Sequence, residues 1–178
     1  MTTQHTTTQQ ILLLATCVYL VLLALTTFFT RATRRRFLAA VVGGLAVAVV
    51  GVGVEFLFQT LGFWYYPSAD QLFGPPLIYP PVVALFAVLA LLGWRVTRRF
   101  GWRGQAVFLT AVTVVGTFRD YFVAGHALGF IVLAPGVLTV LVDVVCWAGT
   151  TALAQAVMRL VAGPADSDPL ARRPWRAA

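Results

Sequence analysis

The stretch FLAAVVGGLAVAVVGVGVEF, residues 37–56, is a run of apolar residues in which only Glu55 carries a charge. About 20 apolar residues in a helix are enough to cross the hydrocarbon core of a bilayer. Gly44, Ala48, Gly51 and Glu55 recur at helical spacing and share one face. Small residues let helices approach closely, so we expect this face to contact protein and not lipid. The stretch therefore predicts a membrane-crossing helix with a carboxyl turned inward.

The same apolar character extends along most of the chain. Of its 178 residues, 60% are hydrophobic and only 11% are charged, which is far from the composition of a soluble domain. Hydropathy and helix breakers predict five spans, at about 10–30, 37–60, 77–96, 104–125 and 136–161. We therefore expect an all-α, multi-pass integral protein of the cell membrane, with one transmembrane domain over residues 1–162.

The basic residues, all of them arginine, predict the orientation of these spans. Four arginines lie in 31–36, four in 95–103 and four in 159–176, whereas the N-terminal tail and the other two connections have none. Because positive charge favours the cytoplasmic side, we expect the N-terminus outside and the C-terminus inside. Residues 163–178, rich in proline and charge, predict a disordered cytoplasmic tail. Arginines at segment ends favour topology and lipid headgroups over nucleic acid, which we do not expect as a partner.

Four ionisable residues fall in the outer half of the predicted membrane domain: Glu55, Arg119, Asp120 and Asp143. Each costs about 2.5–3.5 kcal/mol to insert and usually faces a partner or a cavity. Helical spacing places each acid on the smallest or most polar stripe of its span, so we expect the three carboxyls to converge. Arg119 and Asp120 also lie close enough to the interface to reach headgroups and water, which is the alternative for these two.

One arginine cannot neutralise three acids. We expect Arg119 to pair with Glu55 or Asp143, because Asp120 projects about 100° away around an α-helix. A carboxyl left without a cation in a dry site can stay protonated, as a general acid requires. Asp120, nearest to water, would resupply the proton. The predicted catalytic residues are therefore Glu55, Asp143, Asp120 and Arg119.

Aromatic residues surround these acids in the sequence. The run EFLFQTLGFWYYPSADQLFGPPLIYPP, residues 55–81, resembles small membrane proteins of carotenoid and terpenoid biosynthesis, of the lycopene cyclase and carotenoid hydratase types. The matching positions are Glu55, Gly62, Trp64, Tyr66, Gly74, Pro75 and Pro80. The resemblance implies protonation of a carbon–carbon double bond in a lipidic substrate, without a metal or redox cofactor.

Carbocation chemistry of this kind needs aromatic faces beside the acid. The expected substrate-binding residues are Trp64, Tyr65, Tyr66, Tyr121 and His126. An interfacial aromatic belt is the alternative for the loop aromatics. The absence of lysine excludes a Schiff base, and there is no P-loop, dinucleotide fingerprint, hydrolase elbow or His- and Cys-rich metal cluster.

Three functions stay open at this stage. The first is a cofactor-independent cyclase or hydratase acting on an isoprenoid. The second is a small-molecule-binding membrane subunit of a transporter, which would need another chain to hydrolyse ATP. The third is a structural or assembly protein. The expected partners are a lipophilic small molecule, membrane lipid, and other membrane proteins or further copies of the chain.

Overall fold

The fold is helical, as a computed structural model of the chain shows for residues 2–67 and 76–165. The long elements are α1 (Thr2–Thr30), α2 (Arg34–Thr60), α3 (Tyr79–Phe118), the π-helix η2 (Arg119–Ala127) and α4 (Val137–Ala162). A 3-10 turn, η1 (Pro76–Ile78), precedes α3, and two short strands, β1 (Trp64–Tyr65) and β2 (Val132–Leu133), form an antiparallel ribbon. Gly74, Pro75 and the predicted tail from residue 166 onward lie outside the described residues.

Four helices in the described part of the chain are long and apolar enough to cross a membrane, where the sequence predicted five. The difference arises because the predicted spans 77–96 and 104–125 belong to one helical element, α3 continued by η2. This element is broken at Gly101, whose φ of 65° and ψ of −154° are not helical. The prediction of five separate helices is corrected to four helical elements, one of them interrupted.

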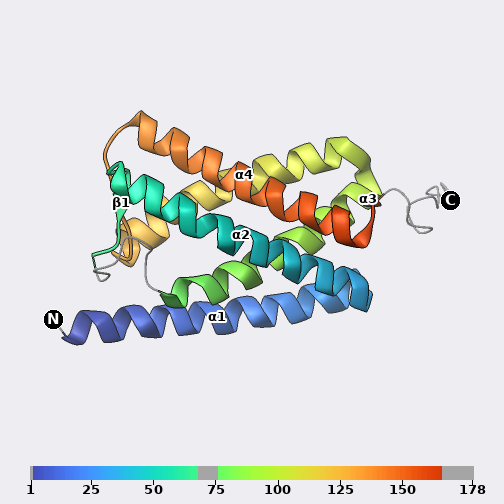
Figure 1. Ribbon diagram of the computed structural model, residues 1–178, viewed down its shortest axis with the longest axis horizontal. Coiled ribbons are helices and arrows are strands. Elements are labelled where there is room, and N and C mark those ends of the chain that lie inside the picture. Colours follow the sequence, from blue (N-terminus) through green and yellow to red (C-terminus); the bar gives the residue numbers. More distant parts are fainter. Residues whose placement is uncertain (1, 68–75, 166–178) are drawn as a thin grey trace.

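The break at Gly101 turns α3 into a hairpin. In an unbroken helix Gly93 and Phe108 would be about 22 Å apart along the axis. Instead, a Cβ atom added to Gly93 would lie 2.9 Å from Cε1 of Phe108. Thr97 also donates a hydrogen bond to the side chain of Gln105. Figure 1 shows the chain reversing at the end of the molecule that carries the α3 label.

Small residues bring α2 against both of its neighbours. A Cβ atom on Gly43 would lie 2.7 Å from the carbonyl oxygen of Ala154 in α4, and one on Gly44 would lie 2.3 Å from that of Val83 in α3. Both distances are shorter than real contacts, so only glycine permits this approach. The prediction that Gly44 and Ala48 face protein is confirmed, since both are buried.

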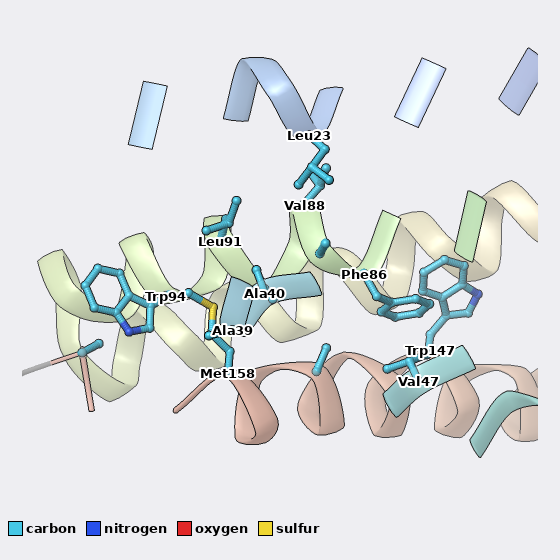
Figure 2. Close-up of a cluster of buried hydrophobic side chains, with 14 residues drawn as sticks. Leu23, Ala39, Ala40, Val47, Phe86, Val88, Leu91, Trp94, Trp147 and Met158 are labelled. Carbon is cyan, nitrogen blue, oxygen red and sulfur yellow. The ribbon is translucent and has the colours of Figure 1, made fainter. Parts of the chain in front are cut away.

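The buried apolar cluster runs between α2, α3 and α4 and includes Leu23 of α1 (Figure 2). Phe86 and Trp147 lie side by side at one end of this cluster, and Trp94 lies at the other. Outside the core the molecule is covered by exposed large apolar side chains, for example Phe28, Val49 and Leu160. Soluble monomers rarely expose apolar surface on this scale, whereas a lipid-facing surface requires it.

Arginines of the first two clusters meet Arg159, the described member of the third, at one end of the molecule. Arg35, at the start of α2, donates to the carbonyl oxygen of Val161 at 3.0 Å. Arg95 in α3 donates to the carbonyl of Phe29 at the end of α1. Arg159 in α4 donates to Thr97 Oγ1 at 3.3 Å. The ribbon and η2 lie at the opposite end (Figure 1).

Candidate functional site

The predicted acids converge on one cavity of about 160 Å³. The cavity lies between α2, α3, η2 and α4, and Trp64 and Leu133 of the ribbon also line it. Six of the nine residues expected at the site line it: Glu55, Trp64, Tyr66, Arg119, Asp120 and Asp143. Most of the other lining residues are aliphatic or aromatic. The site is thus a small, mainly apolar space with charged groups on its walls.

Asp120 is the acid that Arg119 neutralises. The Arg119 guanidinium donates from Nε and Nη2 to Oδ1 of Asp120, at 2.9 and 2.5 Å. The other oxygen, Oδ2, accepts from the indole nitrogen of Trp147 at 2.7 Å. The prediction that Arg119 pairs with Glu55 or Asp143 is therefore wrong. It assumed α-helical geometry, whereas the π-helix η2 begins at Arg119 and the long arginine stem folds back onto its neighbour.

Trp147 is held in place for this bond by its neighbours on α3 and η2. Its ring stacks on Phe86 with centroids 5.8 Å apart, and the Arg119 guanidinium lies 5.1 Å above it. A Cβ atom on Gly116 would lie 2.2 Å from Cδ2 of the indole, so this glycine makes room for the ring. The indole nitrogen is thereby fixed toward Asp120.

Glu55 is surrounded by neutral donors. Its Oε2 accepts from the Trp64 indole nitrogen at 2.8 Å, and its Oε1 accepts from the Tyr66 hydroxyl at 3.0 Å. Gln59, one turn along α2, donates a longer bond of 3.4 Å. An ionised carboxylate accepts hydrogen bonds only, so this set of donors suits the ionised form. Burial, and then the charge of Glu55, raise the pKa of Tyr66 well above its ordinary value, so the phenol keeps the proton that it donates.

Asp143 is the acid that keeps one carboxyl oxygen without a partner. Its residue is 6% exposed, and its Oδ2 has no hydrogen-bond partner within residues 2–67 and 76–165. It shares the α4 face with buried Thr139 and with Cys146 and Thr150, which line the cavity. This confirms the polar stripe that the sequence predicted. A buried carboxyl oxygen without a partner is costly unless something in the cavity contacts it.

The ribbon explains which loop aromatics reach the site. Successive side chains of a strand point to opposite faces. Trp64 and Tyr66 point inward and are 6% and 5% exposed, whereas Tyr65 points outward and is 56% exposed. Three of the expected substrate-binding residues do not line this cavity: Tyr65, Tyr121 and His126. His126 is exposed on η2. The hydroxyl of Tyr121 is buried and has no hydrogen-bond partner in the described part of the chain.

Sequence reasoning missed Trp147 and Phe86. A signal for Trp147 was present, because it lies four residues after Asp143 and so on the same face of α4. Phe86 carried no signal beyond its apolar character. A second missed feature concerns Gly51, expected to pack against a helix: nothing lies within 4 Å of its Cβ position, and it lines the cavity instead.

No group of three His, Cys, Asp or Glu side chains in the described ranges is arranged to hold a metal ion. Comparisons with protein-family models, curated proteins and solved structures found no match to this chain. Fold and site together define a helical protein with helices suited to crossing a membrane and a small polar-walled cavity at one end. The resemblance to carotenoid-biosynthesis proteins stays a prediction.

Proposed function

We propose that this chain is an integral membrane protein of the cell membrane that crosses the bilayer five times, with its N-terminus outside. The crossings are α1, α2, the two arms of α3 on either side of Gly101, the second continued by η2, and α4. The support is the position of Arg35, Arg95 and Arg159, which make their hydrogen bonds at one end of the molecule. Positive charge favours the cytoplasm, so the cavity belongs in the outer half of the membrane.

We further propose that the cavity protonates a carbon–carbon double bond of an isoprenoid or related lipid, as a cyclase or hydratase does. The observation that carries this proposal is the unpartnered carboxyl oxygen of Asp143. Asp120 has a guanidinium and an indole, and Glu55 has an indole and a phenol, but Oδ2 of Asp143 has no partner among the described residues. A neutral carboxyl costs far less to bury than a lone carboxylate. Asp143 is therefore the proton donor.

The step is a proton transfer from the Asp143 carboxyl to one alkene carbon. The alkene π pair forms the new C–H bond, and a cation develops at the adjacent carbon. Aromatic faces of Trp64, Tyr66, Phe86 and Trp147 line the cavity and stabilise this cation. The cation collapses by losing a proton to the carboxylate of Glu55, or by adding water, which then loses its extra proton to the same carboxylate. Proton return from Glu55 to Asp143 then restores the site.

Deuterium incorporation tests this assignment. The purified protein is incubated in D2O with a panel of acyclic polyenes, and the products are analysed by mass spectrometry. We expect product deuteration with wild type and none with Asp143→Asn, while Asp120→Asn chiefly lowers stability because it removes the charge that pairs with Arg119. Deuteration by Asp143→Asn at the wild-type rate would rule out Asp143 as the acid. Retained ligand without any deuteration would favour the binding-subunit function.

Substitution of Gly51 tests the cavity independently of the acids. Leucine at Gly51 has open space and fills the cavity, so we expect deuteration to stop while the fold is kept. Gly53, two residues along α2, also has nothing within 4 Å but is exposed on the outer face. Gly53→Leu is the matched control and should retain activity. Equal activity of the two variants would place the chemistry elsewhere.

A further inference from the structure

A second cavity, of about 190 Å³, lies between α1, α3 and η2. Its lining is apolar except for Tyr19 and Arg119, and includes Leu12, Ala15, Leu85, Val123, Ala124 and Phe130. Three residues line both cavities: Ile78, Val82 and Arg119. The two spaces therefore adjoin, and the side chain of Arg119 forms part of the boundary between them.

Arg119 is suited to divide the two spaces without sealing them. Its guanidinium is held by Asp120 and lies over the face of Trp147 on the side of the first cavity, and it also hydrogen-bonds with Tyr19, which lines the second. The Arg119 side chain is nevertheless 41% exposed, whereas that of Asp120 is 16% exposed. An arginine stem is apolar, so a hydrocarbon chain can lie along it while the charged head stays on its carboxylate.

The second cavity lies beside the outer surface of the helix bundle. α1 packs mainly on α3 and η1, and most of its large apolar side chains are exposed. η2 has no buried residue. In Figure 1 α1 runs along one side of the bundle, outside the group formed by α2, α3 and α4. The second cavity therefore lies next to the apolar surface that would face lipid.

We propose that the second cavity holds the chain of a single-chain lipid whose reacting end lies in the Asp143 cavity, so that the substrate comes sideways from the bilayer past Arg119. This inference rests on the proposed function and names the shape of its substrate. A dry cavity of about 150 Å³ holds a molecule the size of benzene. Each of the two cavities alone is of that size, whereas the two together hold a bent hydrocarbon chain. A lipid with two chains does not fit.

Photolabelling tests the path of the chain. Two probes are used, geranylgeraniol and oleyl alcohol, each carrying a photoreactive diazirine at the end remote from the hydroxyl. The labelled peptides of the full-length protein in micelles are mapped by mass spectrometry. We expect label on residues 11–19 of α1 and on residues 123–130, which span the end of η2 and the segment after it, with at least one probe. Preference for the branched or the linear probe identifies the chain as isoprenoid or acyl.

Variants on the two walls of the second cavity sharpen the test. Ala124→Phe fills the cavity and should lower labelling about tenfold, since 1.4 kcal/mol, within the usual cost of overpacking, is a factor of ten. Ala127→Phe is the matched control, because Ala127 lies on the same π-helix but is exposed and outside the lining. Ala15→Phe fills the cavity from α1, in case the first variant does not fold.

Label spread evenly over the apolar surface, or unaffected by both filling variants, would overturn the inference. The outcome is separable from that of the proposed function, because Asp143→Asn should abolish deuteration and leave labelling intact. Labelling without deuteration by wild type would overturn the acid chemistry alone. Deuteration without cavity labelling would overturn the path of the chain alone.

Discussion

The hydrogen bond between Trp147 and Asp120 is the contact whose removal tests the site most directly. Trp147→Phe keeps an aromatic ring against Phe86 but removes the Nε1 donor, which lies 2.7 Å from Oδ2 of Asp120. A bond to a charged group contributes about 1.5–3 kcal/mol. The missing second ring leaves a gap in the core that costs about 1 kcal/mol more. We expect the free energy of unfolding to fall by about 2.5–4 kcal/mol.

A double-mutant cycle with Asp120→Ala separates these two contributions. The coupling free energy between Trp147 and Asp120 should be about 1.5–3 kcal/mol, because the gap appears in both arms and cancels. Unfolding in micelles is followed by circular dichroism, since the substitution itself changes tryptophan fluorescence. Trp102→Phe, at a residue 76% exposed, is the control and should change stability by less than about 0.5 kcal/mol. A coupling below about 0.5 kcal/mol would refute the bond.

Two further predictions concern packing and pH. Gly44→Ala should destabilise the fold by about 1–3 kcal/mol, because its Cβ would overlap the backbone of Val83. Gly53→Ala, the control, should stabilise the fold by about 0.5–1 kcal/mol. Equal effects of the two substitutions on thermal unfolding would contradict the close approach of α2 and α3. Burial, and then the charge of Glu55, raise the pKa of Tyr66 in the folded protein. The protonated phenol therefore contributes its full share to the free energy of unfolding below the unfolded pKa of about 10, and this share is lost as pH rises above it. The stability difference between wild type and Tyr66→Phe should therefore shrink above that pH, and a difference that stays constant in strongly alkaline buffer would count against the Tyr66–Glu55 bond.

The convergence of the acids was predictable because it depends only on helical periodicity. Glu55 follows a stripe of small residues, and Asp143 lies on a stripe of small polar ones, so burial of both could be inferred from spacing. The pairing of Arg119 was not predictable in this way. It depends on a change from α- to π-helical winding at that residue, and no spacing rule in the local sequence marks such a change.

The turn inside α3 shows a second limit. Arginines on both sides of Gly101 indicated a connection between two spans, and the sequence was interpreted as two helices joined by a short loop. The structure reverses the chain at a single non-helical residue. The backbone conformation of one residue depends on how both arms pack, through contacts such as that of Gly93 with Phe108, and these contacts join residues far apart in the sequence.

Gly101 also decides at which end of the molecule Asp120 lies. Its φ and ψ lie in a region that is essentially restricted to glycine. Without this reversal α3 would be a rod about 60 Å long, twice the thickness of the hydrocarbon core. The rod would carry Asp120 to the end of the molecule opposite Glu55. In the proposed arrangement a residue without a side chain, at the cytoplasmic end, therefore keeps both acids in the outer leaflet.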